Sequence, residues 1–109
     1  MKKILPIALS ALLMLSGCGS SSSAVEDPVE KYGSDTLKLF TWGEYLGENV
    51  ISNFEKQYGV DVIVEYFDSN EMMFTKLQGG DSYDVIVPSD YMIQRLISED
   101  MLQPIDKSL

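Results

Sequence analysis

Three mainly apolar stretches alternate along the chain with three stretches in which apolar residues recur at helical spacing. The apolar stretches, residues 37–42, 60–67 and 83–87, are rich in β-branched and aromatic residues and predict strands. The helical spacing is carried by Val50, Ile51, Phe54 and Tyr58, then by Met72, Met73 and Leu77, and then by Met92, Ile93, Leu96 and Ile97. Strands that alternate with helices over short connections predict an α/β fold with a parallel sheet and helices on both faces.

Residues with capping chemistry precede the second and third predicted helices. Asp68 and Glu71 have the spacing of a capping box, with Asp68 as the N-cap and Glu71 three residues later. Ser89 or Asp90 caps the third helix. We interpret Asp68 and Asn70 as capping residues rather than ligand contacts.

The amino terminus has the features of a removable export signal. Two lysines precede an apolar core over 4–15, which is too short for a permanent membrane helix of about 20 residues. The segment ends in a sequence that resembles the bacterial lipobox, Leu15-Ser16-Gly17-Cys18. We expect removal of 1–17 and lipidation of Cys18, which anchors an exported protein at the outer face of the plasma membrane or in the periplasm. The alternative is an ordinary secretory signal with an incidental cysteine.

Residues 18–35, between the signal and the first strand, lack a hydrophobic period. Only glycine, serine and alanine occupy 19–24, which is typical of a flexible tether. The chain is therefore divided into a signal peptide (1–17), a lipidated cysteine with a linker (18–35) and one small domain (36–109). The alternative for the linker is an arm that packs on the domain.

The composition excludes several functions. The 8 basic and 17 acidic side chains argue against nucleic-acid binding, because phosphates attract lysine and arginine. The absence of histidine and the single cysteine exclude Ser-His-Asp catalysis, Cys-His catalysis, histidine-ligated metal sites and an internal disulfide. Neither the dinucleotide-binding glycine motif nor the phosphate-binding P-loop motif occurs. We expect no cofactor, no metal and no catalytic site.

Three loops, 42–45, 68–71 and 89–91, follow the predicted strands and meet where ligands bind in open parallel sheets, at the carboxyl ends of the strands. They hold three aromatic residues, four carboxylates and no basic residue. Aromatic faces attract ammonium groups by about 0.5–2 kcal/mol, and carboxylates add charge-assisted hydrogen bonds. The predicted ligand is an organic cation with several amines, and the candidate residues are Trp42, Glu44, Tyr45, Ser89, Asp90 and Tyr91. Core packing for the tryptophan, helix capping for Ser89 and Asp90, and surface packing for the tyrosines are the structural alternatives.

Several motifs in order resemble one protein family. Residues 39–45 (LFTWGEY), 54–60 (FEKQYGV) and 83–91 (YDVIVPSDY) are similar to the spermidine/putrescine-binding proteins of bacterial ABC importers. The resemblance covers about residues 36–109. It implies a type II periplasmic-binding fold of two lobes, of which this chain is a truncated, amino-terminal part of the first lobe. It also implies a monomer that encloses a polyamine between its lobes and delivers it to a membrane permease.

The resemblance also assigns roles at the site. Trp42 and Tyr45 correspond to the aromatic wall of the polyamine cleft, and Glu44 corresponds to an amine-contacting carboxylate. Ser89 and Tyr91 correspond to residues that contact one end of the polyamine, with Asp90 between them as an extra acid. These residues form one wall of a cleft, so we expect the 109-residue chain alone to bind polyamine weakly or not detectably.

Other functions remain open from the residues. The same fold could bind another solute, such as an amino acid, an anion or a metal chelate, although an anion site would need basic groups at the edge and Arg95 falls inside a predicted helix. A hydrolase could use Glu44, Asp68 or Asp90, but no nucleophile motif accompanies them. A response-regulator-like domain shares the strand-helix alternation, but the export signal argues against a cytoplasmic protein.

Overall fold

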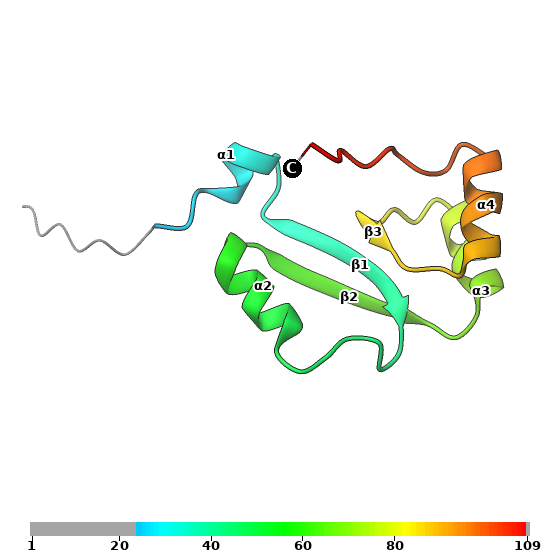
Figure 1. The fold of residues 1–109 in the computed structure, drawn as a ribbon, viewed down its shortest axis with the longest axis horizontal. Coiled ribbons are helices and arrows are strands. Elements are labelled where there is room, and N and C mark those ends of the chain that lie inside the picture. The colour runs from blue at the N-terminus through cyan, green and yellow to red at the C-terminus, as the bar shows by residue number, and fades with distance from the viewer. Residues whose placement is uncertain (1–23, 109) are drawn as a thin grey trace, which may run out of the picture.

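The computed structural model describes residues 24–108, and a three-stranded parallel sheet lies at its centre (Figure 1). The sheet has the order β2-β1-β3 and consists of β1 (Thr36–Trp42), β2 (Asp61–Phe67) and β3 (Val85–Ile86). The helices are α1 (Pro28–Tyr32), α2 (Val50–Tyr58), α3 (Asn70–Gln78) and α4 (Asp90–Ser98). The predicted alternation of strands and helices around a parallel sheet is confirmed. No helix in the described residues is long and apolar enough to cross a membrane.

The central strand, β1, sets the register of the sheet. It pairs with β2 from Thr36↔Asp61 to Trp42↔Phe67, and with β3 at Phe40↔Ile86 and its neighbouring pair. Because all three strands run in the same direction, their carboxyl ends lie at one edge, beside which α3 and α4 begin (Figure 1). In the strand order β2-β1-β3, the chain moves across the sheet in one direction from β1 to β2 and in the other direction from β2 to β3. Because both connections are right-handed, α2 and α3 lie on opposite faces of the sheet.

The core lies between one face of the sheet and the helices α3 and α4. Phe40 of β1 and Phe67 of β2 meet edge to face, with ring centroids 4.9 Å apart. Tyr83 stacks on the ring of Phe40 at 4.3 Å. The helices complete this buried cluster with Met73, Phe74, Met92 and Leu96. The apolar positions that face the sheet therefore hold α3 and α4 against it.

The third strand is shorter and more exposed than the sequence predicts. A buried strand over 83–87 was expected, but only Val85–Ile86 pair as a strand, and Val85 is 44% exposed. The Asp84 carboxylate accepts a hydrogen bond from the Lys38 N–H at 2.7 Å, in place of a strand carbonyl. Backbone hydrogen bonds to β1 still flank the strand, because the Asp84 N–H donates to the Lys38 carbonyl and the Val87 N–H to the Phe40 carbonyl, each at 3.0 Å. The strand β3 lies at an edge of the sheet.

The N-cap of α3 is Ser69, so the predicted capping box of Asp68 and Glu71 is wrong. Ser69 has an extended backbone, and its Oγ accepts a hydrogen bond from the Met72 N–H at 3.1 Å. This shift of one residue leaves Asp68 exposed before the helix and places Glu71 in its first turn. Glu71 bonds elsewhere, as described below.

A short helix, α1, lies within the segment that the sequence predicts to be a linker. The Asp27 carboxylate caps it by accepting from the Val29 N–H at 2.9 Å, and Gly33 ends it with a φ of 79°. A helix of five residues is too short to show a hydrophobic period. The predicted signal peptide, Cys18 and the first part of the linker lie outside the described residues.

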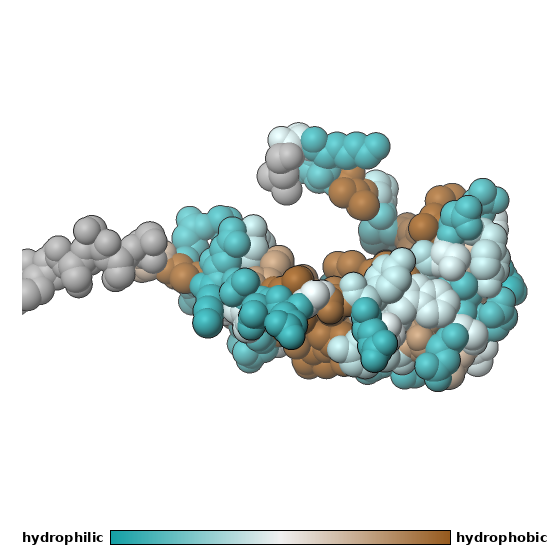
Figure 2. Space-filling view, turned by 60° about the horizontal axis from the view of Figure 1, so that its bottom comes forward, coloured by the Kyte–Doolittle hydropathy of each residue, from teal (hydrophilic) through white to brown (hydrophobic). Residues whose placement is uncertain are grey.

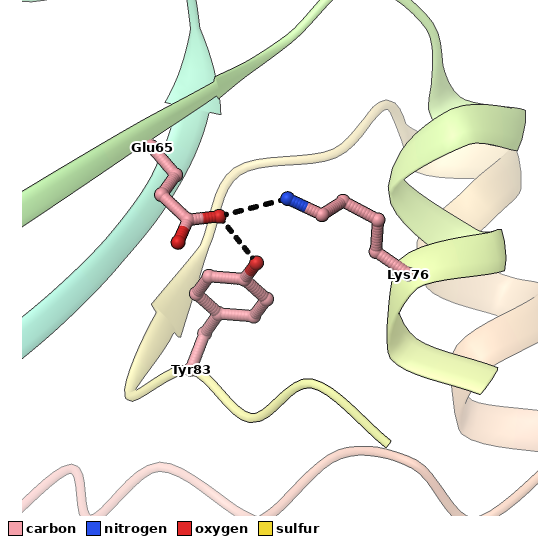
Figure 3. Close-up of polar contacts among 3 residues, drawn as sticks. All are labelled: Glu65, Lys76 and Tyr83. Atoms are coloured by element: carbon pink, nitrogen blue, oxygen red, sulfur yellow. Dashed lines mark hydrogen bonds and ion pairs between the residues drawn. The ribbon is translucent and has the colours of Figure 1, made fainter. Parts of the chain in front are cut away.

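A polar cluster joins β2, α3 and the approach to β3 (Figure 3). Oε2 of Glu65 accepts hydrogen bonds from Lys76 Nζ at 3.0 Å and from Tyr83 Oη at 2.5 Å. The Lys76 ammonium also lies 5.3 Å from the ring centroid of Phe40. The Tyr83 hydrogen bond, and then that of Lys76, lowers the pKa of Glu65 below its ordinary value. The ionised carboxylate is therefore favoured in the folded chain.

Replacing Glu65 should reduce stability in a pH-dependent way. A lowered folded-state pKa stabilises the fold above the ordinary carboxyl pKa of 4.5, and this stabilisation is lost as the pH falls through the folded value. Glu65→Gln should therefore unfold at lower denaturant concentration than wild type at neutral pH. The difference should narrow between about pH 5 and about pH 3. Glu48→Gln, at an exposed loop position, is the control. A difference for Glu65→Gln that is the same at both pH values would contradict this role.

Candidate functional site

The end of β1 places Trp42 at the carboxyl edge of the sheet. Its ring packs against Phe67 with centroids 4.5 Å apart, and the side chain is half-buried. Trp42 therefore contacts the core while part of it remains accessible to solvent. This position is compatible with both interpretations from the sequence, core packing and ligand contact.

The chain leaves β1 through a turn that contains Glu44 and Tyr45. Glu44 has a φ of 56°, in the left-handed region that costs a non-glycine residue about 1–2 kcal/mol. Tyr45 is 66% exposed. Within the described residues, neither side chain makes a hydrogen bond, so both are available to a ligand.

Asn70 joins the starts of α3 and α4. Its side chain is only 6% exposed, and its Oδ1 accepts from the Ser89 N–H at 2.9 Å while its Nδ2 donates to Ser89 Oγ at 3.0 Å. Ser89 holds the N-cap position of α4 but makes no side-chain capping bond, and its hydroxyl accepts from Asn70 instead. The interpretation of Asn70 as a helix cap is therefore wrong, and its bonds reach 19 residues along the chain.

A second bridge lies beside the first. Tyr91 Oη donates to Oε1 of Glu71 at 2.9 Å, and Tyr91 is 51% exposed. This hydrogen bond is the largest cause of the lowered pKa of Glu71 and of the raised pKa of Tyr91. Asp90 is exposed, and its Oδ1 accepts from the Tyr91 N–H at 2.8 Å. The structure thus brings Ser89 and Tyr91 to the first turn of α3.

Sequence reasoning missed Glu71 and Asn70 as members of this site. Residues 68–71 were counted among the loops of the carboxyl edge, but the apparent capping box gave Glu71 a local explanation, and Asn70 was interpreted as a capping residue. Their partners, Ser89 and Tyr91, are far along the chain, and no periodic pattern indicates such pairs. The predicted convergence of the three loops at one edge was the available signal.

Basic side chains do not reach these bridges as hydrogen-bond partners in the described residues. Arg95 of α4 stacks over Phe74, with 3.8 Å from Cζ to the ring centroid, and its Nε donates to Glu99 at 3.2 Å. The charged group that takes part in a bridge is therefore the Glu71 carboxylate. Its pKa is lowered first by the Tyr91 hydrogen bond, and the positive charge of Arg95 also contributes to lowering it. The described residues contain no group of three or more metal-ligating side chains that could hold a metal ion.

A hollow of about 330 Å³ lies at the opposite end of β1, lined mainly by apolar side chains. Tyr32, Leu37, Phe54 and Tyr58 are among its lining residues, and none of the six predicted ligand residues is. Hydrophobic surface is also visible in the middle of the face shown in Figure 2. The hollow offers aromatic rings but a single carboxylate, that of Asp84, which already accepts a hydrogen bond from the β1 backbone.

Comparison with known proteins gives similarity over most of the described chain. No protein-family model matches it. The putrescine-binding periplasmic protein PotF of Escherichia coli is 38% identical over 74 residues, which cover 67% of this chain and 20% of the relative. The spermidine/putrescine-binding periplasmic protein 1 of Haemophilus influenzae is 42% identical over 78 residues, 69% of this chain and 22% of the relative. The chain is similar to bacterial polyamine-binding proteins.

Solved structures agree with the sequence relatives. A spermidine/putrescine ABC transporter protein from Listeria monocytogenes matches with a TM-score of 0.66 and 45% identity, over 69% of this chain and 24% of that one. The substrate-binding protein PotD of Streptococcus pneumoniae matches with a TM-score of 0.65 and 43% identity. The expected resemblance and the α/β fold are confirmed. The chain spans about a fifth of the length of the curated relatives it matches.

Proposed function

We propose that this chain supplies one wall of a polyamine site in a non-catalytic solute-binding protein of a bacterial ABC importer. The observation that carries the proposal is the pair of bridges at the carboxyl edge, which set Ser89 and the half-exposed ring of Tyr91 beside an ionised Glu71. Aromatic faces and carboxylates suit protonated amines. Arg95, whose charge also acts on Glu71, donates its Nε–H to Glu99 rather than to the bridges. The names of the relatives support the same ligand class.

The proposed roles follow from what each side chain exposes. Trp42, supported by Phe67, and the exposed Tyr45 offer ring faces to the carbon chain and ammonium groups of the ligand. Glu44 and Asp90 offer exposed carboxylates that bind ammonium groups. These assignments are predictions. They are supported by the exposure of the side chains and by their position at the carboxyl edge of the sheet.

A single wall limits the affinity. Cation–π attraction is about 0.5–1 kcal/mol at exposed sites and rises to about 2 kcal/mol when water is excluded. The relatives are several times longer than this chain, so their additional residues are the proposed source of the opposing wall. The complete protein would then bind as a monomer and present the loaded form to a membrane permease.

Polyamines should stabilise a protein of the relatives' full length that carries this chain. A ligand at 100 times its dissociation constant adds about 2.7 kcal/mol to the free energy of unfolding. We expect thermal shifts with spermidine or putrescine but not with glutamate or sulfate. Trp42→Ala and Tyr91→Ala should each lose a large part of the shift, because each removes a ring from the wall. Tyr58→Ala, at the opposite end of the sheet, should keep it. Shifts with glutamate, or wild-type shifts in both site variants, would contradict the proposal.

We also propose that the protein is exported and held at the membrane by lipid on Cys18. Support comes from the lipobox-like sequence and from relatives that are named periplasmic. Each buried CH₂ of an acyl chain contributes about 0.8 kcal/mol to anchoring. Cys18→Ala should move the protein from the detergent phase to the aqueous phase in a partition assay, whereas Ser20→Ala should not. Equal partitioning of the Cys18 variant and wild type would overturn lipid anchoring.

A further inference from the structure

The hydrogen bond between Tyr91 and Glu71 can run in only one direction. An ionised carboxylate carries no proton, so the Tyr91 O–H must donate to Glu71 Oε1 across the 2.9 Å between the oxygens. The lowered pKa of Glu71 keeps the carboxylate ionised at neutral pH. Because its proton is already donated to Glu71, the phenol oxygen can act toward a ligand only as a hydrogen-bond acceptor.

The neighbouring bridge has an equally defined direction. The backbone N–H of Ser89 can only donate, so the Asn70 atom that faces it at 2.9 Å must be Oδ1. The amide Nδ2 therefore faces Ser89 Oγ at 3.0 Å and donates to it. Both hydroxyl groups are thus held in place from the first turn of α3, by a buried amide and by a carboxylate.

We propose that Glu71 is a positioning residue that makes Tyr91 an obligate acceptor and so favours ligands with N–H donors. The inference rests on the proposed polyamine site. An ammonium N–H finds a lone pair on the Tyr91 oxygen, whereas the oxygen of a carboxylate or phosphate ligand finds no proton there. The same bond fixes the half-exposed ring so that its face can meet the cation. Glu71 thus acts through Tyr91 and need not contact the ligand.

A double-mutant cycle tests this role in a protein of the relatives' full length that carries this chain (the full-length protein). Calorimetry would measure spermidine affinity for wild type, Glu71→Gln, Tyr91→Phe and the double variant. Each single substitution should weaken spermidine binding about tenfold. Tyr91→Phe removes the acceptor oxygen. In Glu71→Gln the amide can donate to that oxygen as well as accept from it, so the phenol proton is no longer held away from the ligand. Adding the second substitution to either single variant should reduce spermidine affinity by less than about a further threefold, because the two residues act as a unit. Asp68→Asn, which removes a nearby exposed charge, is the control and should also cost less than about threefold.

A spectroscopic readout separates positioning from a general loss of structure. In wild type, the ring carbon signal of Tyr91, assigned by its loss in Tyr91→Phe, should titrate above the ordinary tyrosine pKa of about 10. In Glu71→Gln this pKa should fall, because the charged acceptor is gone, while the melting temperature stays close to wild type. An unchanged Tyr91 pKa in Glu71→Gln would contradict the proposed hydrogen bond between the two side chains.

The outcomes distinguish this inference from the proposed function. Wild-type affinity in Glu71→Gln overturns the positioning role alone and leaves polyamine binding intact. If the two losses of affinity multiply to about a hundredfold in the double variant, Glu71 contacts the ligand independently of Tyr91, and the positioning role is also overturned. A wild-type protein that does not bind spermidine removes the proposed function, and the inference with it.

Discussion

The parallel pairing of β1 with both of its neighbours is the constraint on which the rest of the structure depends. It brings the carboxyl ends of three strands to one edge, and the residues that follow each strand then lie at that edge. The register also decides which face each side chain occupies. A slip of one residue would move Phe40 and Trp42 to the opposite face and separate them from Phe67. Core and candidate site therefore depend on the same register.

The core and the polar bridges hold the site in complementary ways. Phe40 and Phe67 fix the distance of α3 and α4 from the sheet through apolar contacts, which have little directional preference. The two atoms of the Asn70 amide then fix the position of Ser89, because hydrogen bonds require specific geometry. A buried amide without its partner would cost about 1–3 kcal/mol, so the arrangement resists rearrangement. This combination is the basis on which the proposed ligand wall would be preformed.

The fold could be predicted from the sequence because its elements have periodic patterns, as α2 and α4 show. Features set by single side chains could not. Ser69 rather than Asp68 caps α3, and the Lys38 N–H donates to the Asp84 carboxylate rather than to a carbonyl of β3. Both features depend on local geometry that spacing leaves ambiguous. At the site, the topology predicted the edge, and the structure brings Ser89 and Tyr91 to the first turn of α3 there. The ligand-binding roles of the candidate residues stay predictions. The positioning role proposed for Glu71 depends on a hydrogen bond between residues 20 positions apart, which no periodic pattern encodes.

The chain presents its candidate wall with the ring of Tyr91 half exposed and that of Trp42 resting on Phe67. The central claim is that this edge, rather than the apolar hollow at the opposite end of the sheet, receives the ligand. The most direct test is a crystal structure of the full-length protein with spermidine. We predict ammonium groups of the ligand against the rings of Trp42 and Tyr91. Spermidine bound instead in the hollow beside Phe54 and Tyr58, with the carboxyl edge empty, would contradict the account.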